Sequence, residues 1–414
     1  MAHVAIVGAG IVGLACATAL QMRGHALTLI DPSAPGEGCS LGNAGALSRA
    51  SCVPLGLPGA WKQVPRWLAD PAGPLAISPR YLPRVAGWLW RFQQSTTLAR
   101  VNAIADALHP LLDCTIAKWR PLAAYASVPD LIRQDGYAFA YASAAGYESD
   151  ALGRKLRRDR GIVIDVIEGP AIREFDPALS PQLTHLDVLP EQGHVPNPLR
   201  LSRALATRLR GGGASFVERK ATGFDVRNGR VASVVTEGGD RIAVDHVVLA
   251  AGARSLALST ALGARVPLET ERGYHAMLIN PTVLPRIPVA SGEGKYFATP
   301  MEGGLRIAGT VEFAGLEAPP SYRRADILVE GAKRLLPGLG AERIERWMGH
   351  RPSLPDSLPV IGRSPRFSNA FLAFGHGHVG LAGSAPTADL IADLVDGRVP
   401  FMDVAPFAAE RFAA

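Results

Sequence analysis

The stretch from residue 3 to residue 31 constrains the fold more than any other part of the chain. A short apolar run leads directly into Gly8, Gly10 and Gly13, and the apolar residues that follow recur at helical spacing. A second apolar run then ends at Asp31. Strand, glycine turn, helix, strand and acidic residue in this order predict a β-α-β unit that binds a dinucleotide. The three glycines alone would be weak evidence in a chain with 44 of them, but this context makes the pattern specific.

Each of these residue types suits contact with a dinucleotide. Gly8 permits a tight turn, Gly10 lets the backbone approach a pyrophosphate, and Gly13 lets the helix pack closely on the sheet. The N-terminus of the helix offers free N–H groups and positive partial charge to the phosphates. Asp31 can accept hydrogen bonds from a ribose 2′-OH, and an acid at this position argues against the 2′-phosphate of NADP. The predicted contacts in this unit are Gly8, Gly10, Ile11, Val12, Gly13 and Asp31.

The composition is that of a globular protein with a sizeable core. Of 414 residues, 48% are hydrophobic and 19% are charged, and this length allows two domains or one large one. The net charge of +6 is spread along the chain without a block of like charges, which gives nucleic-acid binding little support. A surplus of this size would attract carboxylate substrates only weakly.

Cysteine spacing and hydropathy bear on the cellular location. The four cysteines, Cys16, Cys39, Cys52 and Cys114, form no Cys-x-x-Cys pair and show no metal-ligand spacing, which is typical of a reduced cytoplasmic protein without a metal site. The first predicted strand begins at residue 3, so we expect no signal peptide. No apolar run reaches the ~18 residues that span a bilayer, although this does not exclude attachment to the inner face of the cell membrane.

A loop rich in glycine, proline and serine follows Asp31 and extends to Ser48. A connection this long after a cofactor-binding strand is more often functional than an ordinary surface loop. Its small residues would let the backbone run beside a flat ligand. The predicted cofactor contacts in this loop are Ser40, Asn43, Ala44, Gly45, Ala46 and Leu47.

Residues 52–100 are hydrophobic, basic and rich in tryptophan. Such a stretch can lie on a membrane surface or on a partner protein. It can also form packed helices of a second domain, and we favour this second interpretation. The stretch contains Trp61, Trp67, Trp88 and Trp90 together with Lys62, Arg66, Arg80, Arg84 and Arg91.

The middle of the chain alternates helical and strand patterns without motifs that indicate chemistry. Asn197 and Pro198 begin a helix there, as cap and first-turn residue. The other predicted elements are a helix over 101–125, a strand over 136–141, a charged helix over 148–160 and the start of a strand at 161–164.

The nucleotide-binding domain resumes after this excursion. A strand over 246–249 ends at Ala251 and Gly252, and small residues at the C-terminal end of a buried strand indicate close approach of the backbone to a ligand. The surrounding elements are three short strands with turns at 228–229 and 238–239, strands within 273–313, a helical and loop segment over 322–336, a strand over 370–374 and a final helix over 384–395.

Several further motifs, taken with the glycine-rich turn, resemble those of one enzyme family. They are the Ser40 to Gly45 loop, Ala251-Gly252, Arg351-Pro352 with Pro355-Asp356 and Pro359, and Gly375-His376-Gly377. From Val4 to about Gly397 the chain resembles the D-amino-acid oxidase/glycine oxidase superfamily of FAD enzymes. Within that superfamily it most resembles the bacterial D-amino-acid dehydrogenase small-subunit branch.

The resemblance implies an α/β fold with two interleaved domains. A Rossmann-like FAD-binding domain would comprise residues 1–50, 196–272 and 349–414. An α+β substrate-binding domain, built on a large antiparallel sheet, would comprise residues 51–195 and 273–348. The substrate would lie over the flavin between the two domains.

The activity that the resemblance implies is oxidative deamination. A hydride passes from Cα of a D-amino acid, or of a cyclic D-imino acid such as D-hydroxyproline or D-proline, to flavin N5, and the imino acid then hydrolyses to a 2-oxo acid. We expect the FAD to be noncovalent, because no cysteine lies in the segment where sarcosine-oxidase relatives attach it. The alternatives are an oxygen-using amino-acid oxidase and the FAD subunit of a membrane-associated electron-transfer complex, with a quinone or another electron acceptor.

The resemblance also implies substrate contacts. Arg351 matches the arginine that binds the substrate carboxylate, and its planar fork suits bidentate recognition, although a structural arginine is the alternative. Tyr296 and Tyr274 match tyrosines of related enzymes, with packing into the sheet as the alternative. His376 completes the catalytic candidates. His376 and His378 lack further ligands nearby in sequence, so no metal site is predicted.

The remaining cofactor contacts follow from the same match. Backbone N–H groups of the 375–381 loop would face the flavin, where a helix N-terminus stabilises negative charge. Two positions depart from the family pattern: Gly42 replaces an alanine, and Thr222 lies near a position that usually holds a valine beside the adenine. The contacts implied in this way are Thr222, Ala251, Gly252, Gly375, Gly377, His378, Val379, Gly380 and Leu381.

Overall fold

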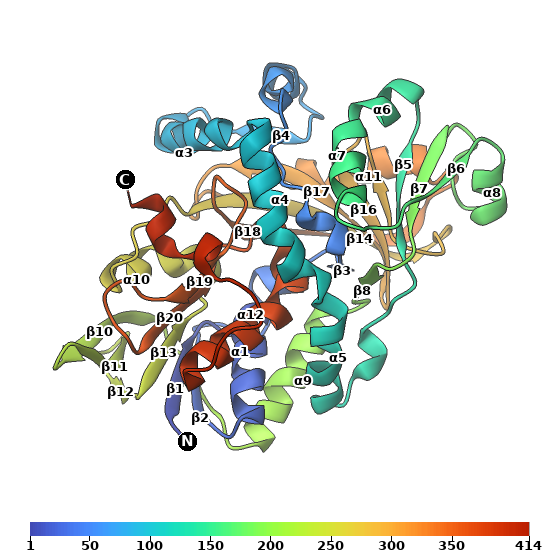
Figure 1. The fold of residues 1–414 in the computed structure, drawn as a ribbon. Helices are drawn as coiled ribbons and strands as arrows, with labels where there is room; N and C mark the ends of the chain where they lie inside the picture. Colours follow the sequence, from blue (N-terminus) through green and yellow to red (C-terminus); the bar gives the residue numbers. More distant parts are fainter. Residues whose placement is uncertain (414) are drawn as a thin grey trace.

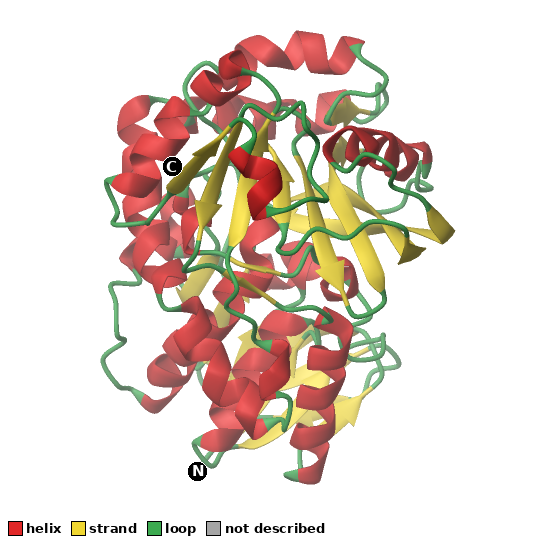
Figure 2. Cartoon of the chain, turned by 90° about the vertical axis from the view of Figure 1, so that its right-hand side faces the viewer, coloured by secondary structure: helices red, strands yellow, loops and turns green. Residues whose placement is uncertain are grey.

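The computed structural model describes residues 1–413 and contains two main sheets in separate layers (Figures 1 and 2). The first sheet has six strands with β1 near its centre, between β13 and β2, and all of its pairings except β19–β20 are parallel. Its strands, in spatial order, are β19 (Val360–Arg363), β20 (Ala370–Phe374), β13 (His246–Leu249), β1 (His3–Val7), β2 (Ala26–Ile30) and β9 (Ser215–Val217).

Both faces of this sheet are covered, as a parallel sheet requires. Val4 and Ile6 of β1 belong to a core shared with three helices, and the alternate residues Ala5 and Val7 belong to a core shared with a three-stranded meander and a short helix. The helices are α1 (Ile11–Met22), α9 (Pro198–Gly211) and α12 (Gly380–Asp396). The opposite layer is β10 (Ala221–Arg227), β11 (Arg230–Thr236), β12 (Arg241–Ala243) and α10 (Ser255–Ala261).

The second sheet has nine strands and is mostly antiparallel, which confirms the predicted fold class. Its parallel pairings are β15 with β5 and β17 with β4. The path runs through β18 (Ala341–Ser353), β14 (Glu269–Pro281), β17 (Gly304–Phe313), β16 (Tyr296–Met301), β15 (Val289–Ser291), β5 (Tyr137–Tyr141), β7 (His185–Leu189) and β6 (Asp165–Glu168), and β4 (Leu75–Ile77) pairs with β17.

The two faces of this large sheet have different neighbours. Helix α11 (Arg323–Leu335) covers one face, where Tyr274 and Tyr296 lie in its core. The opposite face receives the segment η1 (Cys39–Gly42), since Gly42 lies against Trp347 and accepts a hydrogen bond from His275. We call these the α11 face and the loop face.

The predicted elements are mostly present, and two differ for identifiable reasons. The helix expected over 101–125 is two helices, because the second turns to donate from the Thr115 hydroxyl and the Trp119 indole to carbonyls of α12 (2.6 and 2.9 Å). The strand expected at 161–164 begins only at Asp165, because Gly161 has a φ of +71° and turns the chain. The α-helices between residues 48 and 184 are α2 (Val64–Ala69), α3 (Leu82–Ser95), α4 (Leu98–Asp113), α5 (Thr115–Tyr125), α6 (Ala144–Ser149), α7 (Ala151–Arg158) and α8 (Ala171–Phe175).

Short elements complete the chain. A two-stranded ladder pairs β3 with β8, and single 3-10 turns connect larger elements. They are β3 (Ala46–Leu47), β8 (Gly193–His194), η2 (Arg49–Cys52), η3 (Ala60–Gln63), η4 (Pro129–Leu131), η5 (Gly252–Arg254), η6 (Gly377–Val379), η7 (Ala405–Phe407) and η8 (Ala409–Phe412).

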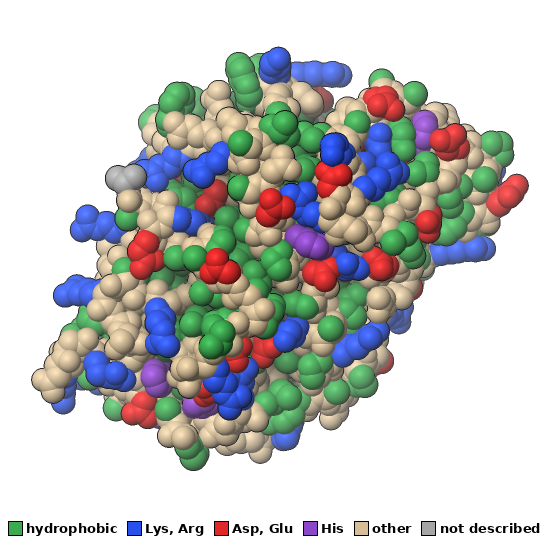
Figure 3. Space-filling model, in the orientation of Figure 1, with side chains coloured by type: hydrophobic (Ala, Val, Ile, Leu, Met, Phe, Trp, Pro, Cys, Tyr) green, Lys and Arg blue, Asp and Glu red, His purple; other side chains and the backbone are tan. Residues whose placement is uncertain are grey.

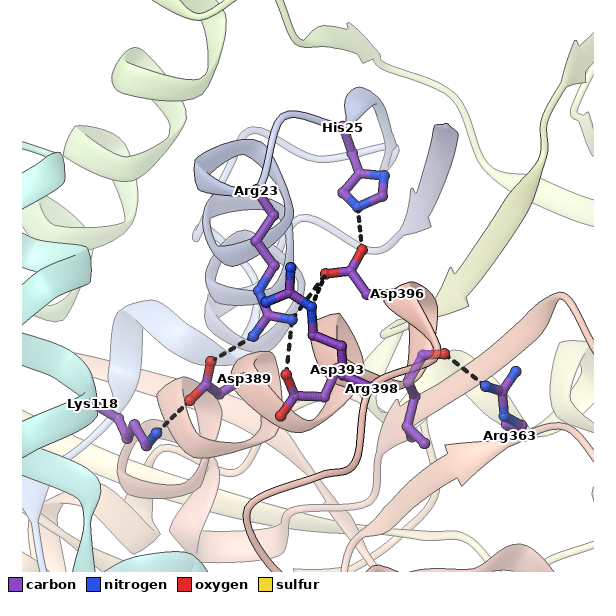
Figure 4. A network of polar contacts seen from close by, with 9 residues as sticks. Arg23, His25, Lys118, Arg363, Asp389, Asp393, Asp396 and Arg398 are labelled. Atoms are coloured by element: carbon purple, nitrogen blue, oxygen red, sulfur yellow. Dashed lines mark hydrogen bonds and ion pairs between the residues drawn. The ribbon is translucent and has the colours of Figure 1, made fainter. Parts of the chain in front are cut away.

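A network of charged side chains joins α12 to α1 and α5 (Figure 4). The Arg23 guanidinium lies 3.0, 2.8 and 3.1 Å from carboxylate oxygens of Asp389, Asp393 and Asp396. Lys118 pairs with Asp389, and the His25 ring lies 2.8 Å from Asp396. The network therefore holds the C-terminal helix against both an early helix and a helix of the intervening segment.

The tryptophan-rich segment divides between core and surface. Trp88 is buried and packs on Phe92 and Phe313 at centroid distances of 5.4 and 5.3 Å, as a packed helix predicts. Trp61 and Trp90 are 51% and 62% exposed. Figure 3 shows hydrophobic and basic side chains side by side on the edge that holds α3. Among residues 1–413, no helix combines the length and the apolar character needed to cross a membrane.

Candidate functional site

The glycine-rich turn after β1 has the geometry that a dinucleotide requires. Gly8 has a φ of +111°, and a Cβ there would lie 2.3 Å from the carbonyl oxygen of Ala250. A Cβ on Gly13 would lie 1.9 Å from the carbonyl oxygen of Gly8. Both positions therefore require glycine, and the turn brings the N-terminus of α1 to the carboxyl end of β1.

The polar groups at this turn fit the adenosine and pyrophosphate part of FAD. Helix α1 begins after Gly10 without a side-chain cap, and the backbone N–H of Ile11 donates to the Ser40 hydroxyl (2.8 Å). The Asp31 carboxylate, at the end of β2, accepts from the N–H groups of Ala9 and Ser33 (both 2.8 Å). These bonds hold Asp31 beside the glycine turn, where its remaining lone pairs can accept from ribose hydroxyls.

The loop after β2 lies on the loop face of the large sheet. Thr299 donates its hydroxyl to the carbonyl oxygen of Ala44 (2.8 Å), and Arg306 donates to the carbonyl oxygens of Asn43 and Leu41 (2.6 and 3.0 Å). Arg306 is buried, and this burial lowers its pKa to about 10. The backbone of Ala46 and Leu47 pairs with β8. The second sheet therefore fixes the path of the predicted cofactor loop.

The glycine at position 42, where the family pattern has alanine, has a steric explanation. A Cβ on Gly42 would lie 1.9 Å from the Trp347 ring, which stacks on His275 at a centroid distance of 5.0 Å. Trp347, His275 and Arg306 support the loop, and sequence reasoning missed all three. Each comes from a different strand, so no local motif marks them. The glycine at position 42 was the one available signal, because it replaces a larger residue.

The C-terminal loop 375–381 lies near Arg351 but directs its two histidines differently. The His376 ring is 2% exposed and lies 2.9 Å from the Thr387 hydroxyl of α12, and burial lowers its pKa to about 3. His378 lies on the other side, where burial and the charge of Arg351 lower its pKa to about 4. His376 thus contacts α12 and not the arginine, so its position does not support contact with a substrate. Within residues 1–413, no group of three or more His, Cys, Asp or Glu side chains is placed to hold a metal ion.

Arg351 lies in β18, a strand that contacts three segments predicted to bind the cofactor: η1, η5 and η6. Its guanidinium crosses over Gly273, where a Cβ would lie 2.3 Å from Cζ. It donates to the carbonyl oxygens of Thr310 and Gly309 (3.1 and 3.4 Å). In the described part of the chain, no carboxylate lies within 4.0 Å of this guanidinium. Arg351 is therefore a half-buried positive charge without an anionic partner, beside the cofactor loops.

The structure does not bring the predicted tyrosines together with Arg351. Tyr274 donates its hydroxyl to Glu312 (2.5 Å), and Tyr296 donates to the carbonyl oxygen of Gly331 in α11 (2.8 Å). Both rings lie in the core under α11, whereas Arg351 lies on the loop face. These contacts support the packing interpretation of both tyrosines. Thr222 is exposed on β10, where its hydroxyl donates to the carbonyl oxygen of Val235 (3.2 Å).

A small pocket opens at the loop face near these segments. One wall is apolar and comes from the segment around α3, and the other is polar and comes from β14, β18 and the C-terminal loop. The lining residues are Leu55, Trp88, Phe92, Glu271, Ser353, Leu354, Ser357, Gly375, Gly377 and His378. The cavity measures only about 10 Å³, so these walls would have to move apart to admit a substrate.

Comparison with known proteins agrees with this arrangement. The family described as DAO, FAD dependent oxidoreductase, matches residues 3–394. A D-amino-acid oxidase from Bradyrhizobium diazoefficiens is 44% identical to this chain, with 99% of each chain covered. A D-amino acid dehydrogenase from Allorhizobium ampelinum is 28% identical, again with 99% of each covered. Among these two relatives, the more similar one carries the name of an oxidase.

Solved structures show the same fold. Glycine oxidase from Geobacillus kaustophilus superposes with a TM-score of 0.76 at 22% identity, with 99% of both chains covered. Glycine oxidase from Bacillus cereus gives a TM-score of 0.75 at 20% identity, with 97% of this chain and 99% of the other covered. At this identity the likeness concerns the fold alone.

Proposed function

This chain belongs to the DAO family of FAD-dependent oxidoreductases, and we propose that its substrates are free D-amino acids. The observation that carries this proposal is Arg351, a guanidinium without a carboxylate within 4.0 Å, on a strand that contacts three segments predicted to bind the cofactor. The names of the two relatives support the choice of a D-amino acid. We further propose that the FAD is bound noncovalently.

The chain's own residues bind and orient the substrate. The Arg351 fork would hold the substrate carboxylate through two charge-assisted hydrogen bonds, which fixes the orientation of Cα. Gly273 leaves the space in which the guanidinium lies. The apolar wall of Trp88 and Phe92 would keep water from the substrate. When bound, FAD supplies the electron acceptor for the hydride that leaves Cα.

The cofactor would extend from the first sheet to the loop face. We propose that the α1 N-terminus and Asp31 hold its adenosine and pyrophosphate part, and that the 40–47 and 375–381 loops hold the flavin. The domain division also remains our proposal: the boundaries at 272/273 and 348/349 fall inside β14 and β18, which run continuously between the two parts. A strand shared in this way would place Arg351 at the domain boundary.

Flavin reduction under anaerobic conditions tests the substrate. The purified holoenzyme is mixed in a stopped-flow instrument with D-alanine, other D-amino acids, D-proline, D-hydroxyproline and glycine, with L-amino acids as controls. We expect rapid bleaching by one group of D-substrates and none by their L-enantiomers. Bleaching by no member of the panel would contradict the proposal.

Two electron acceptors each have an observation in their favour. The oxidase name of the 44% identical relative favours dioxygen. The exposed Trp61 and Trp90, which lie among basic residues, favour a quinone reached by docking on an anionic membrane surface. Rates of reoxidation of the reduced enzyme by air and by a soluble quinone separate the two. Sedimentation with anionic vesicles, compared between the natural chain and Trp90→Ser, tests the docking itself.

A further inference from the structure

A second charged group lies on the loop face beside Arg351, and no step described above uses it. The Glu271 side chain is 4% exposed, and its Oε2 has no hydrogen-bond partner within residues 1–413. The neighbouring Ser353 is also 4% exposed, and its hydroxyl faces the Glu271 carboxylate. Both line the small pocket together with Gly375 and Gly377 of the C-terminal loop. Unpaired buried polar groups are costly, so the free Oε2 of Glu271 in this pocket indicates a missing partner.

Glu271 and Arg351 are directly opposite each other in the β14–β18 ladder, so both side chains lie on the same face. They form no ion pair within 4.0 Å, because the guanidinium turns toward the carbonyl oxygens of Gly309 and Thr310. The loop face thus presents a positive and a negative group side by side, with neither one neutralising the other. A zwitterionic amino acid carries the same two charges a short distance apart.

The other groups around Glu271 compensate its charge only in part. Glu269 on the same strand accepts the Tyr81 hydroxyl (2.9 Å), and it adds a like charge. His378 in the pocket is neutral at pH 7, because its pKa is lowered to about 4. Burial raises the pKa of Glu271, the positive charge of Arg351 and a hydrogen bond from the Ser353 hydroxyl oppose this shift, and Glu269 adds to it. A carboxylate in this position gains by accepting a proton or a cationic partner.

We propose that Glu271 binds the amino group of the substrate and accepts one proton from its ammonium form. An N–H bond of the ammonium breaks and an O–H bond forms on Glu271, which leaves a neutral amine whose lone pair assists departure of the hydride from Cα. Arg351 and Glu271 together would then select molecules that carry both a carboxylate and an amino group. This inference rests on the proposed oxidation of amino acids.

The dependence of kcat/KM on pH tests the role of Glu271. In the natural chain the zwitterion is the productive form, so kcat/KM should be flat from about pH 7 upward until the amine itself titrates. In Glu271→Gln only the free amine reacts, so kcat/KM should be on the order of 10²-fold lower at pH 7 and should rise with a slope of one as pH increases. Propanoate, which has a carboxylate but no amino group, should perturb the flavin spectrum of both proteins with the same Kd.

Glu312→Gln is the matched control, because Glu312 is a carboxylate on the α11 face that holds Tyr274. We expect it to lower Tm without changing the shape of the pH profile. If Glu271→Gln does not fold, Glu271→Asp takes its place: it should lower kcat/KM and keep the flat profile of the natural chain. A flat profile for Glu271→Gln, or a slope of one for Glu271→Asp, would overturn the assignment. These outcomes presuppose that a D-amino acid bleaches the natural enzyme, so failure of the proposed function is recognised separately.

Discussion

Adjacent residues of β14 lie in two very different environments. On the α11 face, Arg272 is fully buried and donates to the carbonyl oxygens of Gly315 and Pro319 (2.8 and 3.1 Å), and Tyr274 shares Glu312 with it. On the loop face, Glu271 is also buried, yet it has an unpaired oxygen. Burial is similar on both faces, so burial alone does not distinguish structural polar groups from functional ones. The presence or absence of partners does.

Removal of each arginine should separate the two faces most clearly. Arg351→Ala should lower kcat/KM by about 10²- to 10³-fold, because it removes a charge-assisted contact to the substrate, and FAD should stay bound. Arg272→Ala should instead cost about 3–5 kcal/mol of unfolding free energy, because it empties a fully buried site and leaves the half-buried Glu312 without its cationic partner. Steady-state kinetics, flavin absorbance and urea titration measure these effects. Loss of FAD from Arg351→Ala would show that this arginine is structural.

Acid should destabilise the protein through buried neutral histidines. The pKa values of His275 on the loop face and His376 behind the C-terminal loop are both lowered to about 3, below the ordinary value of 6.5. The unfolded chain therefore binds more protons below pH 6.5, and stability falls as pH decreases. Each histidine should cost about 2 kcal/mol at pH 5, which urea titrations at pH 7 and pH 5 would measure. In His376→Gln the loss of stability between pH 7 and pH 5 should be smaller by about 2 kcal/mol. An unchanged loss would show that His376 is not a buried neutral histidine that opposes unfolding at pH 7.

A methyl group at position 273 tests whether the guanidinium needs the space above the strand. In Gly273→Ala the new Cβ would lie 2.3 Å from Cζ of Arg351, so the side chain must move. Overpacking of this kind costs about 1–3 kcal/mol of stability, so we expect Tm to fall by a few degrees and KM to rise about tenfold to hundredfold. Gly303→Ala is a matched control, since its nearest neighbour is the flexible end of Met277 at 3.1 Å. Equal KM values for both variants would argue against the role of Gly273.

The smallest effect is expected from the tyrosine that the sequence pattern placed at the substrate. Tyr274→Phe removes the hydrogen bond to Glu312 on the α11 face, which should cost about 1–2 kcal/mol of stability. We expect kcat/KM to stay within about threefold of the natural value. A much larger loss of activity would show that the two faces communicate.

The sequence predicted those parts of the fold that follow from local pattern. The glycine turn, the periodic helix α1 and the strand that ends at Asp31 all lie within 29 residues, and each has a conformational requirement that only certain residues meet. The split between α4 and α5 was not predictable in this way. It depends on hydrogen bonds from Thr115 and Trp119 to α12, more than 260 residues further along.

The candidate site also divides into residues that local motifs predicted and residues that depend on long-range contacts. Arg351 and the two loops were found because they belong to motifs. Glu271, Trp347 and Arg306 were missed, because their relation to the site depends on strand register and on which face of the sheet a residue occupies. Tyr274 was a candidate because of its motif, but it is three residues from Glu271 and the pleat places it on the other face of the sheet.

The strand order of the first sheet has a consequence for biosynthesis. β1 pairs with β13, and β13 pairs with β20, so neighbouring strands come from residues 3–7, 246–249 and 370–374. A nascent chain on the ribosome cannot complete this sheet until residues 370–374 have emerged, and one edge of β1 stays open until residues 246–249 have been made. A chain terminated before β20 would therefore carry an incomplete, aggregation-prone sheet. The need for chaperones should be greatest before β20 is synthesised.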